Sequence, residues 1–171
     1  LKPGAWAITR VLLAVCATSA LAGPVADRVQ SQSVLRVCVW PDYYGVTFRH
    51  PRTQQLAGID IDLSAELARD LKAKVEYVDS SFPTLIDDLN QDRCDVAMFA
   101  IGMLPQRMEK LAFTQPYMRS DIYGITTKTN TVIKQWADID KPGVLVGVQA
   151  GTFMEPIMAQ RLKQATLVRI Q

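Results

Sequence analysis

The stretch from Asp95 to Arg107 limits the fold of this chain more than any other part of the sequence. Residues 95–100 predict a strand of the kind that is buried on both faces of a parallel sheet. A turn follows, and Pro105 predicts the start of a short helix that presents Arg107. An arginine beside the free N–H groups of a helix start, at the carboxyl end of a strand, lies where α/β proteins collect small anions. The stretch therefore predicts an α/β fold with an anion site at Arg107.

Short apolar runs alternate with amphipathic stretches from residue 34 onward, which is typical of a doubly wound α/β lobe. Its ligand site is expected beyond the carboxyl ends of the strands. The paired acids Asp60 and Asp62 are interpreted as helix-start residues that cap N–H groups and favour the helix dipole. The predicted strands of this lobe lie at 35–40, 74–78 and 95–100, and its helices at 60–72 and 84–90.

The pattern restarts after Tyr117, which predicts a second lobe that is only begun. Thr152, followed by Glu155, predicts the N-cap and third residue of a capping box. The elements expected here are strands at 122–127, 144–148 and 166–170, a short helix at 133–139, and a helix after Thr152.

Residues 1–22 have the features of a secretory signal peptide. Lys2 and Arg10 precede an apolar run of 12 residues that ends in the small-x-small pattern of a cleavage site at Ala22. A membrane span needs about 20 apolar residues, so this run is too short to be one. We expect cleavage after Ala22 and export to the periplasm.

The charge of the mature chain is balanced. Removing Lys2 and Arg10 from the 19 basic residues leaves 17, against 17 acidic ones. This balance argues against nucleic acid or an anionic membrane as the main partner. Because no Gly-x-Ser-x-Gly elbow, Cys/His pair or phosphate loop is present, we expect no enzyme activity and no cofactor.

Two cysteines, Cys38 and Cys94, remain after residue 22. In an oxidising compartment they can form a disulfide. The alternative is a pair of buried thiols on neighbouring strands, which behave as small apolar residues. A metal site is not expected, because His50 is the only histidine and no Cys-x-x-Cys spacing occurs.

Four separated motifs lie within residues 34–170: Gly58-Ile-Asp-Ile-Asp-Leu63, Arg93-Cys-Asp95, Gln106-Arg107 with Phe113-Thr-Gln-Pro-Tyr117, and Gly147-Val-Gln-Ala-Gly-Thr152. In this order they resemble the motifs of the periplasmic (extracellular) solute-binding proteins of family 3, which serve polar amino-acid ABC transporters. The resemblance implies a periplasmic-binding-protein type II-like fold, in which two doubly wound lobes close around one amino acid. It places lobe 1 at 23–120, and a hinge strand with the first part of an incomplete lobe 2 at 121–171.

The resemblance also implies which residues bind the ligand. Arg107 matches the arginine that pairs with the ligand carboxylate, a target that suits a planar guanidinium. Tyr43 matches an aromatic that covers the ligand side chain, and Trp40 at the same strand tip is a second wall. Backbone groups near the matching positions in the 100–102 turn contact the ligand, and the 152–153 turn meets the carboxylate from lobe 2. The full set is Arg107, Tyr43, Trp40, Ala100, Gly102, Thr152 and Phe153.

The same residues have simpler interpretations. Arg107 can be a surface arginine without a ligand, Trp40 and Tyr43 can be core aromatics at a strand end, and Thr152 is a good N-cap with or without a ligand. Leu104 stands where the family usually carries a hydroxyl residue, and Gly102 where it often carries another. This departure favours a ligand that is less polar than arginine or glutamine, or one that is not an ordinary amino acid. The family's aspartate that binds the ligand ammonium is expected beyond Gln171.

The function that this resemblance implies is a monomeric periplasmic protein that captures an amino acid or a similar small carboxylated solute. It would deliver this solute to an inner-membrane ABC permease. The alternative is a sensory or regulatory module of a larger periplasmic protein, such as a sensor kinase, a lytic transglycosylase or a quinoprotein-associated protein. A partial binding lobe that closes around nothing is the third possibility.

Overall fold

The structure is a computed structural model that describes residues 23–171, so the predicted signal peptide at 1–22 lies outside the described residues. Within the described part, no helix is both long and apolar enough to cross a membrane. In chain order the helices and strands are α1 (Pro24–Gln32), β1 (Val34–Val39), β2 (Asp42–Tyr43), β3 (Thr47–Arg49), β4 (Leu56–Ala57), α2 (Ile59–Asp70), β5 (Lys74–Asp79), α3 (Leu85–Asn90), β6 (Val96–Ala97), α4 (Pro105–Met108), a 3-10 turn η1 (Trp136–Asp138), β7 (Leu145–Gln149), α5 (Met154–Arg161) and β8 (Thr166–Ile170).

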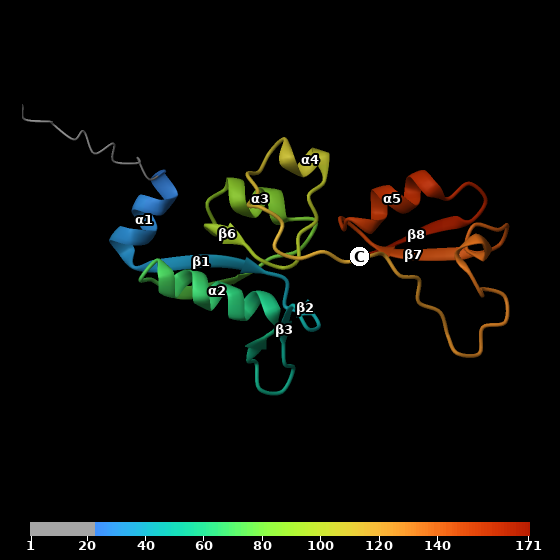
Figure 1. Ribbon diagram of the computed structural model, residues 1–171, viewed down its shortest axis with the longest axis horizontal. Helices are drawn as coiled ribbons and strands as arrows, with labels where there is room; N and C mark the ends of the chain where they lie inside the picture. The colour runs from blue at the N-terminus through green and yellow to red at the C-terminus, as the bar shows by residue number, and fades with distance from the viewer. Residues whose placement is uncertain (1–22) are drawn as a thin grey trace, which may run out of the picture.

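The first unit, residues 24–108, is built on a parallel sheet with the order β5-β1-β6 (Figure 1). All six residues of β1 pair with β5, whereas only Val37 and Cys38 pair with β6. Parallel neighbours need a crossover between them, and the α2 and α3 helices supply it here. The strands and helices predicted at 35–40, 60–72, 74–78 and 84–90 are therefore confirmed to within a few residues.

Helices cover both faces of this sheet because successive side chains of β1 point in opposite directions. On one face, Val37 and its neighbours pack against residues of α1 and α2. On the other face, Cys38 packs with Leu85 of α3 and with Phe99. The arrangement is the doubly wound α/β architecture that the alternating pattern predicted. The buried residues of the first face are Val29, Leu35, Val37, Val39, Ile61 and Ala68.

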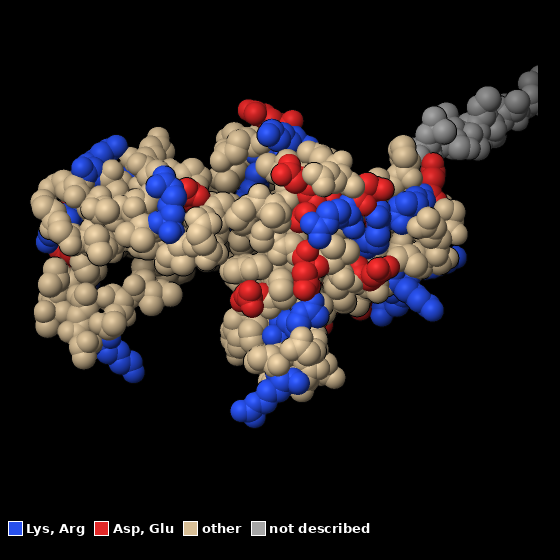
Figure 2. All heavy atoms as spheres, turned by 180° about the vertical axis from the view of Figure 1, so that it is seen from behind, with Lys and Arg blue, Asp and Glu red and all other residues tan. Residues whose placement is uncertain are grey.

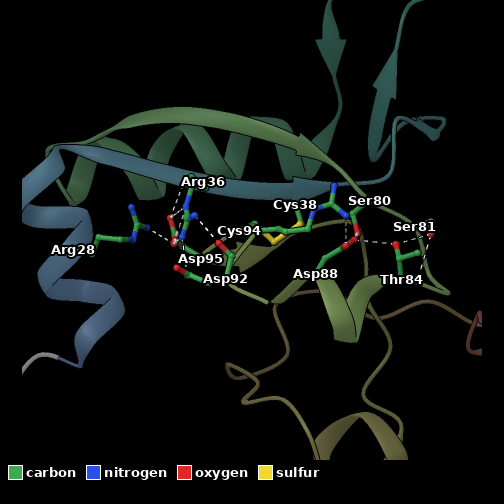
Figure 3. The surroundings of a disulfide bond; sticks show 11 residues. Arg28, Arg36, Cys38, Ser80, Ser81, Thr84, Asp88, Asp92, Cys94 and Asp95 are labelled. Atoms are coloured by element: carbon green, nitrogen blue, oxygen red, sulfur yellow. Dashed lines mark hydrogen bonds and ion pairs between the residues drawn. A yellow bond between two sulfur atoms is a disulfide. The ribbon is translucent and has the colours of Figure 1, made fainter. Parts of the chain in front are cut away.

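The amino-terminal helix α1 is tied to the sheet by ion pairs at Asp95, whose side chain is 1% exposed (Figure 3). Arg36 donates to Asp95 through its backbone N–H and its guanidinium, at 2.7 Å in each case, and Arg28 of α1 pairs with the same carboxylate. Burial alone would raise the pKa of Asp95, but the hydrogen bonds from Arg36 and Arg28 outweigh it and lower the pKa. Basic and acidic side chains are interleaved on this part of the surface in the view of Figure 2.

The second unit, residues 136–170, consists of the parallel pair β7-β8 with α5 as their crossover (Figure 1). The pairing runs from Leu145 with Thr166 to Gln149 with Ile170. The Asp140 carboxylate accepts backbone N–H groups of residues 163–165 at 2.7 to 3.0 Å, which fixes the turn before β8. These bonds lower the pKa of Asp140.

Three sequence-based predictions of elements differ from the structure. The strand expected at 95–100 is confirmed only at Val96 and Ala97, and the chain has left the sheet at Ala100, which takes a left-handed φ of 51°. The strand expected at 122–127 does not form: these residues belong to no strand, and Ile125 is 97% exposed. The helix expected at 133–139 is only the single 3-10 turn η1.

Candidate functional site

Arg107 lies in the short helix α4, which begins at Pro105 after Leu104 in an extended conformation. Its side chain is buried, and the residue is 3% exposed. Nη1 donates to the Gly102 carbonyl at 2.9 Å and Nη2 to the Gly151 carbonyl at 2.6 Å. Burial lowers the pKa of Arg107, yet a guanidinium stays charged in a protein. The interpretation of Arg107 as a surface arginine is therefore wrong.

No carboxylate among residues 23–171 forms an ion pair with Arg107. Its guanidinium carbon lies 5.6 Å from the centre of the Phe82 ring, within the range of a cation–π contact. A buried charge costs free energy unless it is paired. The two carbonyls and the ring offset only part of this cost, and the guanidinium has five N–H groups in all. The arrangement suits an incoming anion.

Ala100 is held by Asp60, which sequence reasoning placed among helix caps. Asp60 is fully buried, and its Oδ2 accepts the Ala100 N–H at 2.7 Å. Both carboxylate oxygens also accept the Tyr117 hydroxyl at 2.9 Å. The capping interpretation of Asp60 is therefore wrong, whereas Asp62 is exposed on the helix surface. The Ala100 N–H is already used, so this group is not free for a ligand.

Four aromatic rings form a cluster at the carboxyl end of the sheet. Ring centres lie 5.3 Å apart for Trp40 with Tyr43 and with Phe82, and 5.1 Å apart for Phe82 with Phe99. Phe82 was missed by the sequence reasoning, although its position three residues after β5 could have indicated it. The structure thus brings Trp40, Tyr43 and Arg107 together through Phe82.

The turn between β7 and α5 contributes Gly151, Thr152 and Phe153. Gly151 has a left-handed φ of 72°, and an added Cβ would lie 3.0 Å from the Pro83 nitrogen, so its backbone passes close to the first unit. The Thr152 hydroxyl donates to the Gln149 carbonyl at 2.7 Å and caps nothing, so the prediction of Thr152 as N-cap is wrong. Phe153 packs against Gly102.

Glu155 does not complete a capping box with Thr152. Its Oε2 instead accepts the Gly151 N–H at 2.8 Å, and its Oε1 accepts Arg169 Nε at 2.5 Å. The bond from Gly151 and then Arg169 lower the pKa of Glu155. The carboxylate is therefore ionised at neutral pH and fixed in place.

A surface hollow of about 380 Å³ lies at the carboxyl ends of β1 and β5, where a doubly wound sheet places its ligand. Of the predicted site residues only Trp40 lines it. Its lining residues are Trp40, Pro41, Asp42, Asp79, Ser80, Ser81 and Thr84.

The two cysteines after residue 22 are bonded to each other, and the described residues offer no metal site. Cys38 and Cys94 are joined by a disulfide in the structure, between β1 and the turn before β6 (Figure 3). Residues 23–171 contain no group of three or more His, Cys, Asp or Glu side chains that could hold a metal ion.

The α/β fold and its elements are those of the type II periplasmic binding proteins. Residues 35–167 match the model of the bacterial extracellular solute-binding proteins, family 3, and the chain belongs to this family.

Its relatives include both binding proteins and an enzyme. The chain is 34% identical over 145 residues to cyclohexadienyl dehydratase of Pseudomonas aeruginosa, covering 83% of this chain and 53% of that protein. It is 31% identical over 118 residues to a probable amino-acid ABC transporter-binding protein of Haemophilus influenzae, covering 69% and 46%. The chain thus spans about half the length of the curated relatives it matches.

Among solved structures, the chain is similar to an ancestral amino acid-binding protein that is a precursor of cyclohexadienyl dehydratase. The TM-score is 0.77 and the identity 31%, with 85% of this chain and 64% of that chain covered.

Proposed function

We propose that this chain is the carboxylate-binding part of a periplasmic protein that captures an amino acid or a similar small carboxylated solute and delivers it to an ABC permease. The observation that carries the proposal is the buried Arg107 guanidinium, which forms no ion pair within the described residues. Planar guanidinium groups bind carboxylates through two parallel hydrogen bonds. The amino-acid-binding relatives support the ligand class.

The aromatic cluster supports a ligand with an apolar body. The Phe82 ring lies next to the guanidinium, and Trp40 and Tyr43 pack against Phe82. Aromatic rings bury apolar groups well. A carboxylate joined to an apolar or aromatic side chain fits both features. Ligand that contacts both units would shift an open–closed equilibrium toward the closed form that a permease recognises.

A thermal-shift screen of the purified chain against the standard L-amino acids tests this proposal. We expect at least one of them to raise the unfolding temperature, since a ligand that binds only the folded state stabilises it. The same amino acid as its carboxamide, which lacks the carboxylate, should give no shift. Equal shifts with the acid and the amide would overturn the role of Arg107 as a carboxylate receptor.

A second candidate function is a lyase reaction, which the 34% identity to cyclohexadienyl dehydratase favours. A general acid needs a pKa near the working pH. Asp60 is occupied by Ala100 and Tyr117, and Glu155 is held ionised, so neither acid beside the site turns suits that role. A cyclohexadiene that carries a ring hydroxyl and a ring carboxylate becomes a benzene ring when it loses water and carbon dioxide. Incubation with such a hydroxycyclohexadienyl carboxylate and detection of ring absorbance therefore separates the two functions.

A further inference from the structure

Gly102 and Phe153 lie against each other across the junction between the two units. A Cβ atom added at Gly102 would lie 2.8 Å from Phe153 Cδ2 and 3.1 Å from its Cβ and Cγ atoms. An approach below 3.0 Å forces something to move. The backbone of Gly102 is outside the left-handed region, so an L-residue could adopt its conformation. The three atoms nearest to such a Cβ all belong to Phe153, so this side chain is the first obstacle to a larger residue at 102.

The same junction holds Arg107. Gly102 supplies the carbonyl for Nη1, and Gly151, two residues before Phe153, supplies the carbonyl for Nη2. Gly151 in turn lies against the backbone of Phe82 and Pro83. The turn at 151–153 therefore approaches the guanidinium with two supports, Phe153 packed on Gly102 and Gly151 packed on the backbone of Phe82 and Pro83.

We propose that Gly102 and Phe153 are a matched steric pair that positions the turn at 151–153 against Arg107 and thereby controls access to the guanidinium. The role of this access in ligand capture rests on the proposed function; the pairing itself does not. Neither residue directs a polar side chain at Arg107, so both are positioning residues. A larger residue at 102 holds the turn at 151–153 away from the Arg107 guanidinium. When the Phe153 ring is removed, the position of this turn no longer depends on the size of residue 102.

The test is the rate at which phenylglyoxal, a reagent for guanidinium groups, modifies Arg107 in the full chain, measured by peptide mass spectrometry. Arg107 reacts slowly in the unchanged chain because it is buried. Gly102→Ala should raise its rate by roughly tenfold or more, the change in an opening equilibrium expected from overpacking by a methyl group. In a Phe153→Ala background, Gly102→Ala should leave the rate unchanged. The exposed Arg119 is the internal standard and should not respond.

Gly151→Ala is the matched control. Its Cβ meets backbone atoms and its φ is left-handed, so it should raise the Arg107 rate equally with and without Phe153. If Gly102→Ala acts equally in both backgrounds, or in neither, the steric pair is refuted. If Gly102→Ala fails to fold, recovery of the far-UV spectrum in the double variant supports the pair, and continued failure refutes it. The assay contains no ligand, so its outcome is separate from the failure of the proposed function.

Discussion

The Asp60 carboxylate holds the backbone of Ala100, accepting its N–H at 2.7 Å, although the two residues are 40 positions apart. The same carboxylate accepts the hydroxyl of Tyr117, which lies in the segment that leads toward the second unit. Burial raises the pKa of Tyr117, and Asp60 raises it further, so the phenol remains a proton donor. One buried side chain thus ties the start of α2 to the site turn and to the crossing segment.

Asp60→Ala should destabilise the chain by about 1–3 kcal/mol or more, because it leaves the Ala100 N–H and the Tyr117 hydroxyl without an acceptor. Urea unfolding monitored by circular dichroism measures the change. Asp62→Ala is the matched control, since Asp62 is in the same helix turn but exposed, and should change stability by no more than about 0.5 kcal/mol. If the two substitutions lower the stability equally, Asp60 acts only as a charge at the helix start and its bonds to Ala100 and Tyr117 contribute nothing.

The disulfide gives a second prediction. Cys38 and Cys94 are 0% and 2% exposed and enclose a sequence separation of 56 residues. Closing a loop of this length is worth about 4 kcal/mol in the chain-entropy description. Unfolding of the native chain should therefore shift to lower urea when dithiothreitol is present during denaturation. The Cys38→Ala/Cys94→Ala variant should show no such dependence on reductant, and an unchanged midpoint in the native chain would mean that the thiols are not joined.

The pairing of Asp95 with Arg28 and Arg36 predicts a loss of stability in acid. The folded pKa of Asp95 is lowered, so its contribution is complete above the pKa of an unfolded aspartate, about 3.9. That contribution is lost as the pH falls from there through the lower folded pKa. Asp95→Asn should remove it at all pH values and cost about 3 kcal/mol at neutral pH, because two arginines lose their partner at a buried position.

The control for this prediction is Asp92→Asn, since Asp92 pairs with Arg36 through a side chain that is 69% exposed. It should change stability by less than about 1 kcal/mol. An acid midpoint of unfolding in Asp95→Asn that equals the midpoint of the unchanged chain would contradict the assignment to Asp95.

Sequence periodicity predicted the first unit well because its signals are local. The alternation of side chains in β1 and the apolar face of α2 are visible from residues that are close in the sequence. The strands at 74–79 and 166–170 were predicted in the same way. The helix α1 was not anticipated, because much of what holds it is a contact between Arg28 and the distant Asp95. The small antiparallel sheet β2-β3-β4 was missed for a related reason, since its strands are only two or three residues long.

Some residues of the candidate site could be predicted from the sequence, and others could not. The short helix that begins at Pro105 and carries Arg107 was predicted and is confirmed, whereas the role of Arg107 in ligand binding stays a prediction. The burial of Asp60 could not be predicted, because an acid at a helix start is ordinarily a capping residue and its partners Ala100 and Tyr117 are far away in the chain. The contact of Phe153 with Gly102 depends on how the two units pack against each other, and the spacing of residues in the sequence does not encode this packing.

The central claim is that Arg107 receives a ligand carboxylate, and isothermal titration of the full chain with the amino acid that gives the largest thermal shift tests it most directly. Arg107→Ala should weaken binding by roughly a hundredfold or more, since a buried charge loses its partner. The affinity of Arg107→Lys should lie between those of the unchanged chain and Arg107→Ala, because an ammonium cannot form the two parallel hydrogen bonds of a guanidinium. Arg119→Ala, which removes an exposed arginine, should bind as the unchanged chain does. Unchanged affinity in a folded Arg107→Ala variant would contradict the account.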